Sequence, residues 1–448
     1  MTATGTEPAA GPAAAPAAAA GPAVRPGAAR RRVVTGGALA AFGVLAVVGF
    51  GLGTHAGLHA RFRLAESGAK VGVPDLVVPA RISAVVLGGV CVLIGLARVW
   101  RGWRGLGDRS DRAGQSDRSG RWTVAGIACL VAAFLCWAVA GESVSLVGIA
   151  QGTLFLSLPL VFGSLSGVLC ERSGVINVSI EGQFLFGAFT AAFAGSLAGS
   201  LWVGLLAGGI AGMLLGAVLA VFSIRYLVDQ VILGVVLNVF ALGLTGFLYD
   251  RLLQPNADTY NNPGVFAPIR IPVLADIPIA GPVLFDSNVF LYLAYLLLVV
   301  LQVGLFHTRW GLRVRAVGEH PQAADTVGIR VLATRYRNVI MGGFVAGIGG
   351  AFFTVGSVGG FTKNMTSGKG FIALAALIFG RWSPLGAMAA ALLFGFADQL
   401  QLVLSGIGTP IPSQALASAP YLATIFAVAG LVGKVTAPKA DGKPYVKQ

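Results

Sequence analysis

Long apolar runs alternate with shorter polar segments along most of this 448-residue chain. An α-helix needs about 20 apolar residues to cross the hydrocarbon core of a bilayer. Nine runs are long enough: Val33–Gly53, Leu76–Ala97, Thr123–Ala140, Leu146–Leu169, Leu201–Ile224, Val231–Tyr249, Val289–Phe306, Val339–Val358 and Leu385–Leu404. Three further pieces are shorter or interrupted by polar residues: Val175–Leu197, Phe371–Phe379 and Leu422–Val432. The pattern predicts an all-α integral membrane protein, a polytopic helix bundle of about 9–12 transmembrane segments, with about 12 crossings favoured.

Charged residues in the connecting segments predict how the bundle is oriented. Residues 98–121 contain seven Arg against three Asp, and residues 307–338 contain six Arg against one Glu and one Asp. Residues 250–287 instead contain four Asp and two Arg. Because Lys and Arg prefer cytoplasmic loops, we expect the first two segments inside, the third outside and both termini in the cytoplasm. The expected outer loop 55–75 departs from this rule, since it carries three basic residues.

The chain is expected to have four parts. Residues 1–32 are rich in Ala and Pro and end in three Arg, which predicts a disordered cytoplasmic tail. Residues 33–140 form an N-terminal transmembrane extension, whose first apolar run lacks a convincing cleavage site and is expected to remain as an anchor. Residues 141–433 form the core bundle, and residues 434–448 form a cytoplasmic C-terminal tail.

The composition excludes an ordinary soluble protein. Charged residues make up only 11% of the chain and hydrophobic residues 56%, whereas soluble domains have about 25% charged residues. The net charge of +14 does not indicate nucleic-acid binding, because the basic residues lie in loops and form no basic aromatic face. The four Cys form no CxxC pair, and His55 and His59 lack further ligands, so no metal site is predicted.

Glycine recurs at every fourth position of one apolar run, at Gly204, Gly208, Gly212 and Gly216. On a helix this spacing makes a flat stripe that lets a neighbouring backbone approach closely. We therefore expect these four glycines to pack helices together. They indicate a bundle and carry no information about cargo.

Two segments place polar residues in apolar surroundings. One is ERSGVINVSIEGQFLFG at residues 171–187, and the other is MTSGKGFIALAALIFGRWSPLG at residues 365–386. Unpaired polar groups are costly in hydrocarbon, so both segments should face protein or a water-filled cavity, the second as a broken or re-entrant helix. The candidate substrate-pathway residues are Asn177, Glu181, Gln183, Asn238, Asp398 and Gln401.

Each of these six side chains has an alternative role, which is to join helices or to satisfy the ends of broken helices. That role is favoured for the amides. Glu181 and Asp398 are the stronger candidates for contact with a solute, because a carboxylate at membrane depth is costly to keep without use.

A polar and basic insert, residues 307–338, separates two of the long apolar runs. It is too hydrophilic for lipid, and its pattern is that of short amphipathic helices rather than a loose linker. We expect another protein to bind this insert on the cytoplasmic side of the membrane. The alternative is a solvated basic loop that only obeys the orientation rule.

Three motifs taken together, SGVINVSIEGQFLFGAF, RWGLRVRAVGEHPQAADTVGI and GKGFIALAALIFGRWSPLGA, resemble the permease subunits of bacterial ABC importers. The resemblance is to the nucleoside and simple-sugar branch, which is related to the branched-chain amino acid permeases, and it covers about residues 146–433. It implies that residues 141–433 are an importer permease core in the bacterial plasma membrane. The N-terminal extension has no counterpart in it.

The resemblance also implies partners: separate ATPase subunits, a second permease subunit (a twin or a paralogue) and an extracytoplasmic substrate-binding lipoprotein. Residues of the insert match the coupling loop that binds the ATPase: Arg313, Arg315, Glu319, Ala323, Ala324 and Gly328. The chain contains no GxxxxGK[ST] motif, so ATP and Mg²⁺ are expected on the partner and no cofactor on this chain. It would be a transport subunit, not an enzyme.

The resemblance thus implies a pathway for nucleosides, or for sugars of the ribose or galactose type, that works by alternating access. For a nucleoside, amides and carboxylates would bind ribose hydroxyls while aromatic side chains stack on the base. The rival is a secondary transporter that works without an ATPase and couples to ions through Glu181 and Asp398. A membrane enzyme has no support, since no catalytic constellation of His, Ser or acidic residues is apparent.

Overall fold

A computed structural model describes residues 27–55, 57–64, 73–107, 116–408, 414–415, 418 and 436–447. The chain separates into two compact units: residues 1–58 with 79–137, and residues 59–78 with 138–448. Within the described residues, nine helices are long and apolar enough to cross a membrane, which confirms a polytopic all-α membrane protein.

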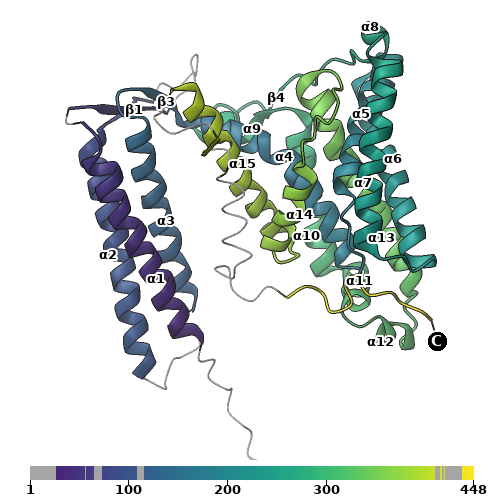
Figure 1. The fold of residues 1–448 in the computed structure, drawn as a ribbon, viewed down its shortest axis with the longest axis horizontal. Coiled ribbons are helices and arrows are strands. Elements are labelled where there is room, and N and C mark those ends of the chain that lie inside the picture. The colour runs from purple at the N-terminus through teal and green to yellow at the C-terminus, as the bar shows by residue number, and fades with distance from the viewer. Residues whose placement is uncertain are drawn as a thin grey trace, which may run out of the picture. The chain divides into compact units, whose positions relative to one another are not determined.

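The first unit consists of three long helices, α1 (Gly27–Leu45), α2 (Ala80–Gly107) and α3 (Ser116–Ala138) (Figure 1). A π-helical segment, Ala46–Leu52, prolongs α1. The backbones of α1 and α2 touch: a Cβ added to Gly36 would lie 2.8 Å from the Gly95 carbonyl oxygen, and one added to Gly95 would lie 2.5 Å from the Ala40 nitrogen. Glycine permits this close packing of the predicted extension.

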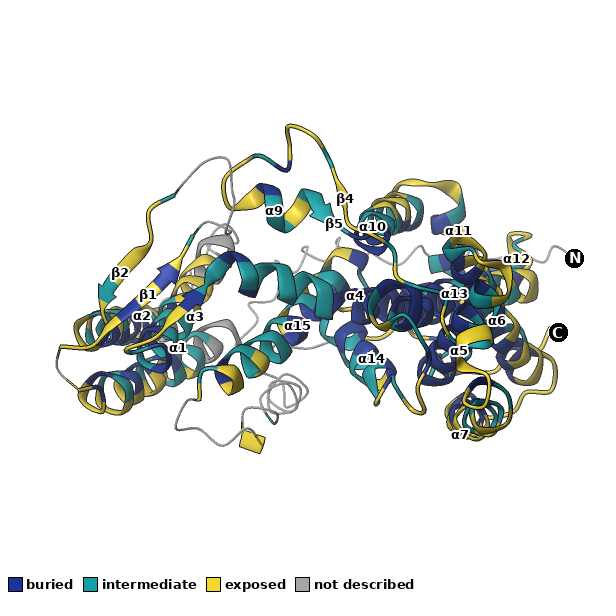
Figure 2. Ribbon diagram, turned by 90° about the horizontal axis from the view of Figure 1, so that it is seen from above, coloured by how far each residue is buried: buried dark blue, intermediate teal, exposed yellow. Residues whose placement is uncertain are grey.

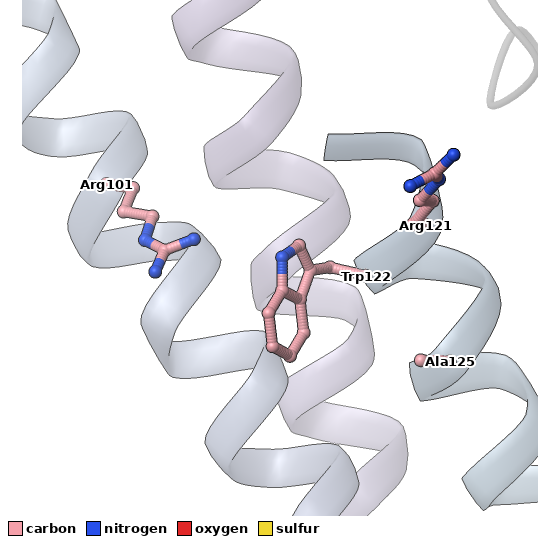
Figure 3. A pocket seen from close by; sticks show the side chains of 4 residues that line it. All are labelled: Arg101, Arg121, Trp122 and Ala125. Carbon is pink, nitrogen blue, oxygen red and sulfur yellow. The ribbon is translucent and has the colours of Figure 1, made fainter. Parts of the chain in front are cut away.

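Basic and aromatic side chains meet at one end of α2 and α3. Arg101 of α2 and Arg121, Trp122 and Ala125 of α3 line a pocket of about 530 Å³ (Figure 3). The Arg101 guanidinium carbon lies 6.0 Å from the centroid of the Trp122 ring. Trp and Arg at the end of an apolar helix are typical of a membrane interface.

The second unit begins with three short strands in the order β2–β1–β3: β1 (His59–Arg63), β2 (Leu76–Pro79) and β3 (Ser143–Ser145). Strand β1 is parallel to β3 and pairs Phe62 with Val144. The polypeptide of the predicted extension therefore contributes two strands, β1 and β2, to the sheet of the second unit.

The remaining elements follow in chain order (Figure 1). The helices are α4 (Leu146–Glu171), α5 (Ile180–Ala198), α6 (Leu201–Ala220), α7 (Gln230–Leu248), α8 (Ala257–Tyr260), α9 (Ala280–Phe285), α10 (Val289–His307), α11 (Arg309–Glu319), α12 (Pro321–Thr326), α13 (Val331–Phe353), α14 (Lys369–Phe379) and α15 (Pro384–Gly406). A two-residue pair, β4 (Ile269–Arg270) and β5 (Asp286–Ser287), lies before α10. π-Helical segments prolong α6, α7 and α13, at Val221–Arg225, Tyr249–Leu253 and Thr354–Val358.

Helices α4 and α13 form the centre of this unit, and Figure 2 shows them mostly dark blue while α7 is largely yellow. The spans containing α4 and α13 are each 78% buried, against 28% for the span of α7. All-round apolar helices that lack a buried face on the protein are those expected to contact lipid. A central pair surrounded by lipid-facing helices follows from this pattern.

The glycine run of α6 lies against α5 and α13. A Cβ on Gly212 would come within 2.4 Å of the Gly343 carbonyl oxygen, and one on Gly208 within 2.8 Å of the Gly187 carbonyl oxygen. An added Cβ on Gly204 would lie 2.7 Å from the Ala191 carbonyl oxygen of α5, and one on Gly216 would lie 3.0 Å from the Gly343 Cα of α13. The four glycines thus let three helices pack at backbone contact.

The three shorter apolar pieces of the sequence have different outcomes. Val175–Leu197 corresponds to α5, and Phe371–Phe379 falls in the short helix α14, whose 11 residues cannot cross a bilayer alone. Neither is among the nine candidate spans of the described residues. Leu422–Val432 lies outside the described residues, so the favoured number of about 12 crossings stays a prediction.

Candidate functional site

Three polar side chains at the start of α5 bond to one another. Asn177 donates to the Gln183 side-chain oxygen at 3.1 Å, Ser179 donates to the Asn177 oxygen at 2.8 Å, and Gln183 donates to Ser179 at 3.1 Å. All three side chains are 0% exposed. Closed networks of this kind satisfy buried polar groups and fix one local geometry. In this structure Asn177 and Gln183 join the α4–α5 turn to α5 and do not face an open cavity.

Glu181, in the first turn of α5, caps the broken helix α14. Its carboxylate accepts hydrogen bonds from the Thr366 hydroxyl at 2.5 Å, the Gly368 N–H at 2.8 Å and the Gly370 N–H at 2.7 Å. The first turn of a helix leaves N–H groups without partners and carries a positive partial charge, which a carboxylate satisfies. Gly370 is required by this contact, because an added Cβ would lie 2.5 Å from the Glu181 nitrogen.

Asn238 fastens α7 to the same region. Its side-chain oxygen accepts the Gly182 N–H at 2.8 Å, and its amide nitrogen donates to the Val178 carbonyl at 2.9 Å. Asn238 is 7% exposed and Glu181 is 6% exposed. Both side chains therefore form their hydrogen bonds with other groups of the protein.

Asp398 and Gln401 differ from the other four pathway candidates. The Asp398 carboxylate on α15 forms an ion pair with Lys369, the first residue of α14, and the two side chains are 17% and 25% exposed. Gln401 is half-buried and lies three residues further along α15, on the same helix face as Asp398. Of the six candidates, these two are the ones that keep access to solvent or solute.

The insert forms α11 and α12 and the start of α13. Thr308 caps α11 by accepting the Gly311 N–H at 3.2 Å, and Val314 and Val317 anchor the apolar side of α11 at 0% exposure. Gly328, with φ +84°, turns the chain from α12 into α13. The amphipathic helices expected from the sequence are present.

The predicted coupling residues face different ways. Arg313, Ala323 and Gly328 are exposed, and Arg315 and Glu319 are half-buried. Arg315 lies over the ring of Phe306, with its guanidinium carbon 5.2 Å from the ring centroid. Ala324 is only 3% exposed, so in this structure it faces the protein and not a partner. The exposed face of α12 consists of Gln322, Ala323 and Thr326, and Val327 directly after the helix is also exposed.

Near the end of α4, the three sequence motifs meet. Glu171 accepts a hydrogen bond from the indole N–H of Trp382, and Arg172 donates to the Trp382 carbonyl at 2.7 Å. Burial lowers the pKa of Arg172, while the nearby Glu319 carboxylate opposes this shift. An added Cβ on Gly318, in the last turn of α11, would lie 2.2 Å from the Arg172 carbonyl oxygen. The insert therefore rests directly on the turn between α4 and α5.

The C-terminal segment, residues 438–445, also reaches this junction. The Ala440 N–H donates to the Gly318 carbonyl at 2.9 Å, and Arg335 donates to the Lys443 carbonyl at 2.9 Å. Tyr445 is 8% exposed and packs in one apolar cluster with Val317, Ala324 and Val331. Figure 1 shows the yellow C-terminal segment passing beside α11.

Sequence reasoning missed several residues of this junction. Glu171 and Trp382 lie within motifs that were noted, but nothing in their spacing shows that they bond. Lys369 was also passed over, although GKGFIA was noted and a lysine at membrane depth needs a partner. Arg335 was counted as a loop charge, yet it is 1% exposed. The available signal was its position, because Arg335 lies only four residues before the apolar run that begins at Val339 and continues α13.

Comparisons with a family model and with individual proteins both identify transport permeases. The model for the family described as "Branched-chain amino acid transport system / permease component" matches residues 149–432. Guanosine ABC transporter permease protein NupQ of Bacillus subtilis (strain 168) is 42% identical over 309 residues, which cover 67% of this chain and 96% of that protein.

Two further relatives cover similar shares. Nucleoside ABC transporter permease protein NupC of Lactococcus lactis subsp. cremoris (strain MG1363) is 39% identical, over 67% of this chain and 96% of its own. Putative glucose ABC transporter permease protein TsgC13 of Haloferax volcanii is 33% identical, over 62% of this chain and 89% of its own. No solved structure is significantly similar to the chain.

Proposed function

This chain belongs to the family of permease components of branched-chain amino acid transport systems, and we propose that it forms the membrane pathway for a nucleoside in an ATP-driven importer. NupQ and NupC, which are named for guanosine and nucleoside transport, are 42% and 39% identical to it, against 33% for the putative glucose permease TsgC13, and this order favours a nucleoside over a sugar.

The position of α12 supports this function most directly. Helix α12 presents an exposed face that includes Ala323, and Val327, the residue directly after the helix, is 75% exposed, while α11 before it is anchored by two fully buried valines. A solvated loop would not need an anchored helix with one face free. Such a face suits a groove on an ATPase subunit, whose bound ATP and Mg²⁺ would supply the energy.

The other partners follow from the same assignment. A second permease subunit would complete the pathway, and an extracytoplasmic lipoprotein would deliver the nucleoside. With the insert in the cytoplasm, both termini lie there too, and the protein resides in the bacterial plasma membrane. Residues 33–140 remain an extension to the core, with residues 1–32 and 434–448 as cytoplasmic tails.

Asp398 and Gln401 are the proposed contacts with the nucleoside. The Lys369–Asp398 pair offers a donor and an acceptor at partly exposed positions on α14 and α15. Ribose hydroxyls and base edges both donate and accept hydrogen bonds, so the pair can exchange its internal bond for bonds to the cargo. Asn177, Glu181, Gln183 and Asn238 act instead as the frame that holds α5, α7 and α14 together.

Uptake of tritiated guanosine by proteoliposomes tests the function. Vesicles carrying this chain with its ATPase, second permease and lipoprotein should accumulate guanosine only with internal MgATP. Vesicles carrying this chain alone should not respond to a proton or sodium gradient. Accumulation by the chain alone under an ion gradient would establish the rival secondary transporter.

A further inference from the structure

We propose that the C-terminal segment, residues 438–445, is a clasp that ties α12 to the α4–α5 turn, with Tyr445 and Arg335 as positioning residues for coupling. The clasp rests on the proposed function, because it would carry the movement of an ATPase bound at α12 into the membrane core. Coupling would then involve three parts of the chain: the insert, the core and the C-terminal segment, which follows α15 in the sequence.

The first contact of the clasp is with the insert. Tyr445 covers Val317 of α11, Ala324 of α12 and Val331 of α13, which are 0%, 3% and 2% exposed. Helix α12 has only six residues and cannot be stable by itself. Its buried side is closed by the Tyr445 ring, while its opposite side stays free. A partner can therefore hold α12 without displacing the clasp.

The second contact is with the α4–α5 turn. An added Cβ on Gly174 would lie 3.1 Å from the Ala440 carbonyl oxygen, and one on Gly442 would lie 2.7 Å from Cδ1 of Ile176. Gly442 has φ +72°, a conformation that favours glycine. Gly174 and Ile176 belong to the SGVIN motif, which leads into the polar frame of α5. The same short segment thus touches the insert and the core motif.

Arg335 makes the clasp costly to open. Its guanidinium donates to the Lys443 carbonyl, and within the described residues its Nε and Nη2 atoms have no hydrogen-bond partner. A buried cation with few partners depends strongly on each of them. Loss of the Lys443 carbonyl would leave the charge of Arg335 without a direct hydrogen bond, so opening the clasp is unfavourable.

Uncoupling of ATP hydrolysis from transport is the test. The purified complex carrying Tyr445→Ala should retain the ATPase and hydrolyse ATP, but move about tenfold fewer guanosine molecules per ATP, since coupling terms of this size are usual. Tyr445→Phe keeps the ring and loses only the hydroxyl that faces Asp325 of α12, so it should retain most of the coupling that Tyr445→Ala loses. Val446→Ala is the matched control, since Val446 is the next residue and is 64% exposed.

A second measurement needs no cargo. Trapping the ATPase with vanadate should change hydrogen exchange at residues 171–177 in the wild-type complex, and Tyr445→Ala should abolish that change while leaving exchange at α12 responsive. If Tyr445→Ala does not reach the membrane, Tyr445→Leu takes its place, because it keeps an apolar contact.

Three results would overturn the clasp: an unchanged ratio of guanosine to ATP, an unchanged response at residues 171–177, or loss of the ATPase from the complex. The last would make Tyr445 part of the docking surface itself. A wild-type complex that hydrolyses ATP but carries no guanosine would instead count against the proposed substrate, and the exchange measurement would still judge the clasp.

Discussion

The Glu181 carboxylate accepts the Gly370 N–H at 2.7 Å, and this bond joins α5 to the first turn of the broken helix α14. The two bonded residues lie 189 positions apart in the sequence, and their bond holds the two motifs together. A carboxylate that the sequence marks as a candidate contact for solute serves here as a helix cap.

Replacing Glu181 with Gln should destabilise the protein. A Gln side chain keeps one acceptor oxygen for three donors, and leaving buried donors unpaired costs about 1–3 kcal/mol each. We expect a lower thermal unfolding temperature in detergent, with uptake reduced in proportion to the folded protein. Glu142→Gln is the control, because Glu142 is exposed. Full stability with complete loss of uptake would instead assign Glu181 to the cargo or to a coupling ion.

Replacing Asp398 with Asn should raise the KM for guanosine. Hydrogen bonds to a charged group contribute about 1.5–3 kcal/mol, which corresponds to a rise of about tenfold or more. Radiolabelled uptake at several guanosine concentrations measures the change, with abundance in the membrane checked by immunoblot. Asp250→Asn is the matched control, because this substitution also breaks an ion pair with a lysine, Lys363. The side chains of Asp250 and Lys363 are 47% and 50% exposed. An unchanged KM would remove Asp398 from the pathway.

The features that the sequence could predict are those that depend only on residues close to one another in the chain. Membrane spans depend on the length and composition of one run, and the glycine stripe on a spacing of four, so both are visible without a structure. The amphipathic insert is likewise a local pattern. The resemblance of three motifs then supplied the family, because their order and spacing are specific together.

What the sequence could not show is which distant residue meets each polar group. Ala323 and Ala324 are equally small, and only the packing of Val317, Val331 and Tyr445 around Ala324 decides that Ala324 is the buried one. Loop charge predicts the side of the membrane on which Arg335 lies, but not its depth in the protein. Lys369 and Asp398 were both visible, yet their pairing depends on how α14 packs against α15.

Bulk on the free face of α12 should block the ATPase. Ala323→Trp places an indole on an exposed face, so the chain should reach the membrane in normal amounts, fail to co-purify with the ATPase and lose uptake. Ala324→Trp should act differently, because Ala324 is buried under Tyr445 and the added volume displaces the C-terminal segment. Ala323→Ser is the control for position 323. Normal co-purification of Ala323→Trp would remove α12 from the docking surface.

Attachment of the C-terminal segment should weaken as pH rises. Burial raises the pKa of Asp441 from its ordinary value of 3.8 to about 7, where it faces Glu171 and Arg335. The attached state therefore binds more protons than the released state between these two pKa values, so protonation of Asp441 stabilises attachment most at low pH, and this contribution is lost as the pH rises through about 7. Release should become about tenfold easier between about pH 6 and pH 8. Hydrogen-exchange protection of residues 438–445, corrected for the intrinsic rate at each pH, measures this change. Asp441→Asn should weaken the pH dependence, and Val446→Ala should keep it. Equal protection at both pH values in the wild type would contradict a protonated Asp441.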